Sequence, residues 1–259
     1  MRPGAATFWI ALAAALSPVL VDLARHWSST PWSRYSLVFP ILFVARIRSE
    51  PSRPSPARDG WAWIAAALAL ELVAVAGGVT KLGRAALPLA VWGGCRLYGL
   101  TGPATVVLVA FAVPVPHGLN ELASPALETG LAHGAARVAR LLGAAPQVLD
   151  PPQLVVGREA LALTPADGGL PVVALLAGLG WHAGLVLREG AVACARRALS
   201  WAALGIPLQA VALTGAVALT AVSGASAARA LLTHAVWPAV AIAGLARARA
   251  LARARRIAP

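Results

Sequence analysis

Charged side chains are scarce in this chain of 259 residues: they make up only 12% of it, whereas 59% of the residues are hydrophobic. A soluble domain carries about a quarter charged residues, so this composition excludes an ordinary water-soluble domain. It also excludes a disordered chain, because disorder requires low hydrophobicity. Several apolar runs approach or exceed the roughly 18–20 residues that cross a bilayer. The sequence therefore predicts a multi-pass membrane protein.

Cysteine is almost absent, with Cys95 and Cys194 as the only two. They form no Cys-x-x-Cys pair and lack the spacing of metal ligands, which argues against a disulfide framework or a zinc site. The best remaining group of possible metal ligands lies on one predicted helix. Its spacing does not suit a metal site, so we interpret it as a solvated helix face. It consists of His117, Glu121, Glu128 and His133. We therefore predict no metal and no cofactor.

Apolar windows predict an all-α polytopic bundle of about eight transmembrane helices. Their approximate ranges are 5–24, 35–46, 61–80, 84–99, 101–116, 168–187, 198–222 and 227–246. The second range is too short to span alone, so we expect it to begin near Pro31 and to be kinked at Pro40. We treat residues 1–259 as a single integral membrane domain.

The distribution of basic residues predicts the orientation. With the N-terminus inside, fourteen of the 22 lysines and arginines fall on the inner side, and cytoplasmic loops carry such an excess. Both termini are therefore predicted to be cytoplasmic, in the inner (plasma) membrane of a bacterium. The net charge of +12 does not predict a nucleic-acid partner, because the arginines lie mainly in short segments between apolar spans. The basic tail 247–259 is read as an anchor to anionic lipid.

The longest segment without a span, residues 117–166, is predicted to form an extracytoplasmic insert. Its first part, Leu119 to Leu142, has the pattern of an amphipathic helix lying at the membrane surface. Its second part, Gln147 to Thr164, contains two short β-prone runs broken by Asp150-Pro151-Pro152 and by Gly157-Arg158. This second part predicts a small β-hairpin.

Several motifs follow one another in a particular order. Residues 32–40 read WSRYSLVFP, Pro114-Val115-Pro116 ends a span, the amphipathic stretch and hairpin follow, and His234 lies in the last span. This order resembles the exosortase/archaeosortase family of membrane transpeptidases, from about Trp27 to Ala246. The resemblance implies a membrane bundle that acts on exported proteins with a C-terminal membrane tail. It also implies a Cys nucleophile, an Arg in the penultimate span and a His.

The chain departs from this family at two of the three catalytic positions. Where the family has its Ala-Cys-Ser-Gly motif, the sequence reads Pro165-Ala166-Asp167-Gly168, so Asp167 takes the Cys position. Where its Asn-x-x-Arg segment is expected, residues 213–216 contain neither Asn nor Arg. Only His234 matches. A carboxylate is a poor nucleophile toward an amide, and the predicted topology places both cysteines near the cytoplasmic side, so thiol-based transpeptidation is not expected.

Two interpretations of Asp167 are left open. In the first, it is the N-cap of the long apolar helix that follows. In the second, Asp167 and His234 form a pair at the outer mouth of the bundle, able to bind a cation or relay a proton. His234 alone is more often a packing residue than a catalyst. Glu71, near the middle of the third predicted span, should also have a partner, for which Arg96, His182 and Gln209 are the candidates.

Three functions remain compatible with the sequence. The first is an exosortase/archaeosortase-like protein without thiol chemistry, which binds or sorts exported proteins through their C-terminal membrane tails. The second is an active membrane protease or transpeptidase with an altered site that uses Asp167 and His234. The third is a structural subunit of a larger membrane complex. The expected partners are the bilayer and such tails or other membrane subunits, and whether the chain is an enzyme stays open.

Overall fold

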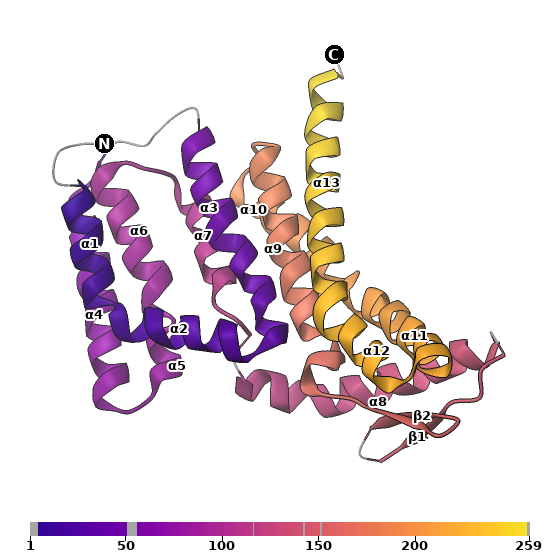
Figure 1. Ribbon diagram of the computed structural model, residues 1–259. Coiled ribbons are helices and arrows are strands. Elements are labelled where there is room, and N and C mark those ends of the chain that lie inside the picture. The colour runs from indigo at the N-terminus through magenta and orange to yellow at the C-terminus, as the bar shows by residue number, and fades with distance from the viewer. Residues whose placement is uncertain (1–4, 51–55, 116, 142, 151, 258–259) are drawn as a thin grey trace. The chain divides into compact units, whose positions relative to one another are not determined.

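A computed structural model of the chain is mostly helical and describes residues 5–50, 56–115, 117–141, 143–150 and 152–257 (Figure 1). The chain divides into two compact units, Met1–Pro114 and Val115–Pro259, and the single membrane domain over residues 1–259 stays a prediction. Val113, just before the boundary, has an extended backbone with ψ of 117°, as expected for a residue that precedes proline. Each unit is described by itself below.

The N-terminal unit consists of short helices. These are α1 (Ala5–Ala15), α2 (Ser17–Ser29), a 3-10 segment (Pro31–Leu37), α3 (Val38–Ser49), α4 (Gly60–Ala76), α5 (Thr80–Gly83), α6 (Ala86–Tyr98) and α7 (Pro103–Ala112). The second predicted span forms two successive elements, the 3-10 segment and α3, and the kink at Pro40 stays a prediction. Pro40 lies in the first turn of that helix, where its missing N–H has no intrahelical partner to lose. Residues 51–55, between the second and third predicted spans, lie outside the described residues.

Helices α4 and α6 approach each other closely at two glycines. A Cβ atom on Gly93 would lie 2.7 Å from the carbonyl oxygen of Gly60 and 2.7 Å from a side-chain carbon of Ile64. Small residues at such a contact let two helix backbones approach, which is how helices associate in lipid. Ile64, Ala67 and Ala90 are buried beside this contact. Close backbone packing therefore holds this unit together.

The C-terminal unit contains the longest helices. It consists of α8 (His117–Leu141), β1 (Gln147–Leu149), β2 (Gln153–Val156), β3 (Glu159–Ala162), a 3-10 turn η2 (Pro165–Gly168), α9 (Leu170–Val186), α10 (Ala191–Ala202), α11 (Gly205–Ser223), α12 (Ala225–Ala230), a π-helical turn η3 (Leu231–Ala235) and α13 (Val236–Ile257). Figure 1 shows α8 lying crosswise to α13. The predicted amphipathic helix is confirmed, with Ala132, Ala136 and Ala139 buried on one face.

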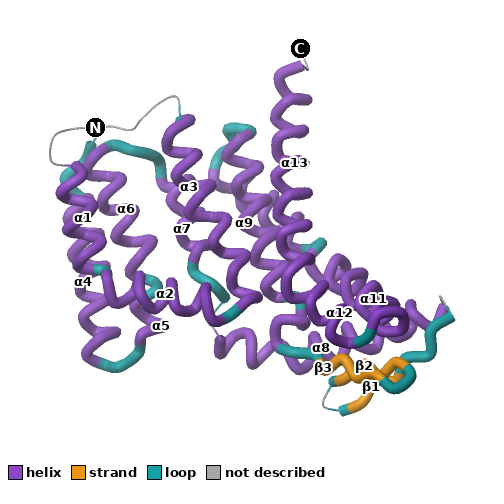
Figure 2. The backbone as a smooth tube through the Cα atoms, in the orientation of Figure 1, coloured by secondary structure: helices purple, strands orange, loops and turns teal. Residues whose placement is uncertain are grey.

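The strands form a three-stranded antiparallel sheet in the order β1-β2-β3 (Figure 2). The predicted hairpin of two runs was too small. The two sequence breaks lie between β1 and β2 and between β2 and β3, so they separate three strands rather than two. Leu154 pairs with Val148 on one side and with Leu161 on the other. Leu154 and Leu161 are buried against Ala132 and Ala136 of α8, so the sheet packs on the amphipathic helix.

One residue of the predicted solvated face of α8 is buried. Glu128 is only 7% exposed, whereas His133 is exposed. The side chains of His117 and Glu121 lie outside the described residues. Glu128 is buried because α8 packs against both η2 and α11, so a second part of its circumference is covered. The solvated-face prediction therefore fails at Glu128.

Two helical segments among the described residues are long and apolar enough to cross a membrane, Ala191–Ser223 and Ala225–Arg255. A third would be α1 with α2, which are bent by 71° at their junction. The predicted spans 198–222 and 227–246 lie within the first two. The set of eight predicted spans is not supported, because α3, α6 and α7 have only 12, 13 and 10 residues. These rise about 15–20 Å, against a hydrocarbon core of about 30 Å.

Candidate functional site

Asp167 is buried at the junction between the sheet and α9. It lies in η2 and is only 4% exposed. Its Oδ2 atom accepts hydrogen bonds from the Thr164 backbone N–H at 2.7 Å and from the Thr164 hydroxyl at 2.9 Å. The Nη1 atom of Arg229, on α12, lies 2.7 Å from the same oxygen. The carboxylate is therefore hydrogen bonded and neutralised in place.

The N-cap interpretation of Asp167 is wrong. Gly169 occupies the N-cap position of α9, with a φ of 84° in the left-handed region, where glycine carries no steric cost. Instead of capping α9, the Asp167 side chain points back and closes the turn that begins at Thr164. Its backbone carbonyl accepts a further bond from the Gln209 amide at 3.2 Å. Asp167 thus joins η2 to α11 and α12.

A second contact ties the sheet to the same helix. The Oε2 atom of Glu159, on β3, accepts a hydrogen bond from the backbone N–H of Ala225 at 3.2 Å. Ala225 is the first residue of α12, and a carboxylate there satisfies one of the N–H groups that lack an intrahelical partner. Glu159 and Asp167 therefore hold both ends of α12, at Ala225 and Arg229.

His234 lies close in sequence to this cluster but is not bonded to it. It belongs to the π-helical turn η3 and its side chain is exposed. In the part of the chain that the structure describes, no hydrogen bond or ion pair joins His234 to Asp167. The structure brings Asp167 together with Arg229, five residues before His234, a partner that the sequence analysis missed. Arg229 is 62 residues from Asp167, and no local pattern indicates such a pairing.

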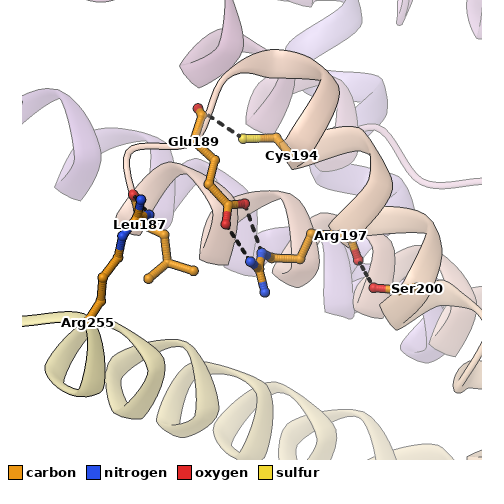
Figure 3. A network of polar contacts seen from close by, with 6 residues as sticks. All are labelled: Leu187, Glu189, Cys194, Arg197, Ser200 and Arg255. Atoms are coloured by element: carbon orange, nitrogen blue, oxygen red, sulfur yellow. Dashed lines mark hydrogen bonds and ion pairs between the residues drawn. The ribbon is translucent and has the colours of Figure 1, made fainter. Parts of the chain in front are cut away.

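Both thiols are wholly buried. Cys95 in α6 and Cys194 in α10 are each 0% exposed and form no disulfide. The Cys194 thiol lies 3.6 Å from the carbonyl oxygen of Glu189 and donates to it (Figure 3). That contact is at the C-terminal end of α9, whereas Asp167 precedes its N-terminal end. The 17 residues of α9 rise about 25 Å, so Cys194 is not next to Asp167.

Glu71 is buried in α4 without the partners predicted for it. It is 6% exposed, and its Oε2 atom has no hydrogen-bond partner among the described residues. Arg96 is bonded to Asp59 instead, through Nε at 3.1 Å from Oδ1 and through Nη2. Gln209 donates to the Asp167 carbonyl in the other unit. The Oε2 atom of Glu71 lies against the space that a Cβ on Gly83 in α5 would occupy. The predicted roles of Arg96 and Gln209 are wrong, because both side chains bond elsewhere, and that of His182 stays a prediction.

An apolar groove of about 340 Å³ runs along α13. Its walls are Leu176 of α9, Trp201 of α10, Leu204 and Leu208 at and after the turn into α11, and Ala239, Val240, Ala243, Gly244 and Arg247 of α13. Gly244 lets α13 approach α9, because a Cβ there would lie 2.6 Å from a methyl carbon of Leu179. Arg247 is the one charged residue among the described lining residues. The groove was not predicted, because it forms where four separate segments meet.

The described residues contain no group of three or more His, Cys, Asp and Glu side chains that could hold a metal ion. The two positions taken over from the family resemblance, Asp167 and His234, are a buried ion-paired carboxylate and an exposed imidazole. The resemblance itself stays a prediction. Comparisons with protein-family models, with curated proteins and with solved structures find no match to this chain.

Proposed function

We propose that this chain is an exosortase/archaeosortase-like protein of the bacterial inner membrane that binds the apolar C-terminal tails of exported proteins without thiol-based cleavage. In this proposal it crosses the membrane several times, with both termini in the cytoplasm and the sheet outside. The two segments that are long and apolar enough to span a membrane support the location. Shorter helices such as α4 and α9 would then be enclosed by other segments or lie in a locally thinned bilayer.

The observation that carries the proposal is the apolar groove along α13. Ala239 and Ala243 are four residues apart and exposed, so both lie on one face of the helix. Small residues in this spacing let a second transmembrane helix approach closely. Arg247 continues the same face one turn further on and lines the groove. A single apolar helix with an acidic residue near its cytoplasmic end fits this surface.

The surroundings of the potentially reactive side chains favour a binding function over a catalytic one. An acyl-enzyme mechanism needs an accessible nucleophile next to a base. The two cysteines are buried in helix contacts, and the Asp167 carboxylate is bound by Thr164 and Arg229. The carboxylate oxygen that would have to react is therefore already engaged by three donors. This arrangement supports a structural role for Asp167.

The test uses a reporter that ends in one apolar span of about 20 residues, with a single Asp at its cytoplasmic end. A photo-crosslinking residue is placed at Ala243 in the full chain, in bacterial membranes. The matched control is the same residue at Ile242, which is 69% exposed but does not line the groove. We expect crosslinks to the reporter from position 243 and few from position 242.

Charge reversal makes the test specific. Arg247→Glu should abolish crosslinking to the Asp reporter and create it with a Lys reporter, because only opposite charges attract at this site. The mass of the crosslinked reporter is measured as well, and an uncut reporter is expected. Equal crosslinking from positions 242 and 243, or none to either reporter, would overturn the proposal.

One observation favours a second candidate function, an altered active site. His234 lies on a π-helical turn, and such turns occur frequently at functional sites. In this alternative, His234 would act as a base beside the Asp167–Arg229 pair. A reporter cut by the wild-type chain but not by His234→Ala, with equal amounts of both proteins in the membrane, would favour this function over binding alone.

A further inference from the structure

A cavity of about 440 Å³ lies at the C-terminal end of α9, where α13 passes it. It is lined by Val186, Leu187, Arg188, Ala252 and Arg255. This volume is within the range of roughly 300–1,000 Å³ that ligand pockets occupy. Its described lining contains two arginines and no acidic residue. The cavity is distinct from the groove along α13, because none of the described lining residues is common to both.

The surroundings of this cavity carry excess positive charge. Glu189 is the acid next to it, and both of its carboxylate oxygens are bonded to Arg197, with Nε 3.0 Å from Oε2 and Nη2 on Oε1 (Figure 3). The charges of Arg196 and Arg255 also act on this carboxylate. Arg188 lines the cavity itself, so the cavity and its surroundings carry four guanidinium groups and one carboxylate. Three positive charges therefore have no acidic counterpart among these residues.

The backbone at Arg188 is in an unusual conformation for an arginine. Its φ is 56°, the one positive φ of a residue other than glycine in the described chain. The N–H of Arg188 bonds to the carbonyl of Leu185 at 3.1 Å, and that of Glu189 bonds to the carbonyl of Gly184 at 3.0 Å. This pair of bonds is the Schellman motif that ends a helix, and its left-handed position is usually glycine.

An arginine in this position costs stability. The left-handed conformation brings the Cβ of an L-residue too close to the following carbonyl oxygen, a clash that glycine would avoid. A strained backbone that persists is a reason to look for a role of the side chain. The exposed Arg188 side chain lines the cavity. A glycine at this position would relieve the backbone strain but would leave no guanidinium group beside the cavity.

Arg255 enters the cavity from the other side. Its Nη1 atom donates to the Leu187 carbonyl (Figure 3), which satisfies one of the carbonyls left open at the end of α9. A guanidinium has five N–H donors in a planar fork, so this bond fixes the group and leaves other donors for a ligand. The end of α9 carries partial negative charge, but the uncompensated arginines outweigh it.

We propose that Arg188 and Arg255 form a binding site for a phosphate group at the C-terminal end of α9. Planar guanidinium forks bind phosphate through paired hydrogen bonds. The phosphate could belong to the headgroup of an anionic phospholipid or to a soluble phosphate compound, and the experiment separates these sources. The site differs from a diffuse lipid anchor along the basic tail in that it depends on two particular arginines. It does not depend on tail binding in the groove.

The test measures binding to the purified full chain in detergent. The probes are phosphatidylglycerol and phosphatidylcholine in mixed micelles, and inorganic phosphate. Binding is followed by tryptophan fluorescence and by the shift in the midpoint of thermal unfolding. We expect phosphatidylglycerol to bind more tightly than phosphatidylcholine. Arg188→Gly and Arg255→Gln should each weaken phosphatidylglycerol binding about tenfold, the effect of losing one charge-assisted contact.

Arg188→Gly also distinguishes binding from folding. Because glycine relieves the left-handed strain, the unfolding midpoint of this variant without ligand should equal or exceed that of the wild type. A loss of affinity in a protein of unchanged or higher stability is the expected result. Arg249→Gln is the matched control, since it removes one charge from the same helix at an exposed position outside the cavity lining. It should change the affinity less than twofold.

The results with the two probes identify the source of the phosphate group and decide whether the proposal holds. Binding of phosphatidylglycerol but not of inorganic phosphate assigns the site to a lipid headgroup. Binding of inorganic phosphate with the same dependence on Arg188 assigns it to a soluble phosphate compound. If neither probe binds, or if Arg249→Gln weakens binding as much as Arg255→Gln does, the proposed site does not exist.

Discussion

The Nη1 atom of Arg229 lies 2.7 Å from the Oδ2 atom of Asp167, and the Asp167 side chain is 5% exposed. The position where a resemblance to exosortases implies a nucleophile is thus occupied by a carboxylate in an ion pair. Thr164 donates two more hydrogen bonds to the same oxygen. The contact joins η2 to α12 and so connects the sheet to the helices that follow. Asp167 therefore contributes to the stability of this junction.

The imidazole of His234 should contribute little to stability. It is exposed and is not bonded to Asp167, so His234→Ala should change the free energy of unfolding by about 0.5 kcal/mol or less. Thermal unfolding of the purified protein measures this change. A loss of more than about 2 kcal/mol would show that the imidazole has a buried partner, as a paired site with Asp167 requires.

The contact between α9 and α10 should tolerate no added methyl group at Gly180. A Cβ there would lie 2.8 Å from the carbonyl oxygen of Arg197 and 3.0 Å from the Cα of Ala198. Gly180→Ala should therefore destabilise the protein by about 1–3 kcal/mol, the usual cost of overpacking. Gly215 in α11 is the control, since nothing lies within 4 Å of the added Cβ. Gly215→Ala should stabilise the helix by up to about 1 kcal/mol, and equal effects of the two changes would refute the close contact.

The stability of the loop between α9 and α10 should depend on pH through Glu189. Two hydrogen bonds from Arg197 hold the pKa of the Glu189 carboxyl below its usual range, against the opposite effect of burial, and nearby arginine charges lower that pKa further. A carboxyl with a lowered folded pKa stabilises the fold above its unfolded pKa of about 4.3. This stabilisation is lost as the pH falls through the folded pKa.

The measurement is the unfolding midpoint as a function of pH. Glu189→Gln should reduce the difference in stability between neutral and acidic pH, and Arg197→Gln should reduce it similarly because it removes the same pair. The pair is partly exposed, with side-chain exposures of 26% for Arg197 and 17% for Glu189, so an effect of about 1 kcal/mol or less is expected. An unchanged pH profile in both variants would contradict this role.

The proposed topology places the turn between β2 and β3 outside the cell and the basic tail inside. Arg158 in that turn and Arg253 in the tail are both exposed, so each is replaced singly by Cys. A membrane-impermeant maleimide should label Arg158→Cys in intact spheroplasts and Arg253→Cys only in inverted vesicles. The native cysteines give no background because both are 0% exposed. Labelling of both variants from the same side would refute this orientation.

The positions of the helices were predictable from the sequence, but their lengths were not. The hydropathy pattern predicts one continuous span over residues 5–24, although the helix is broken within them. The division between the predicted spans 84–99 and 101–116 agrees with the structure, because α6 ends at Tyr98, just before Gly99 with a φ of 59°, and α7 begins at Pro103. The first predicted span is bent by 71° between α1 and α2. A hydropathy window averages over such breaks, whereas proline and left-handed glycine end or bend the helix at a particular residue.

The site was less predictable than the fold, because its contacts join distant parts of the chain. The motif order points to Asp167, but its partner Arg229 is 62 residues away and belongs to no motif. The left-handed Arg188 carries no sequence signal, since the position takes glycine in most helices. Glu71 was recognised as a buried acid, yet its neighbour Gly83 has no side chain to reveal the contact.

The most direct test of a structural rather than a catalytic Asp167 is a double-mutant cycle with Arg229. Asp167→Asn and Arg229→Gln should each lower the free energy of unfolding by about 1–3 kcal/mol, a buried-pair cost reduced by the partial exposure of Arg229. The double variant should lose much less than the sum, with a coupling energy of about 1 kcal/mol or more. Additive losses in the double variant, with no coupling between the two positions, would contradict this account.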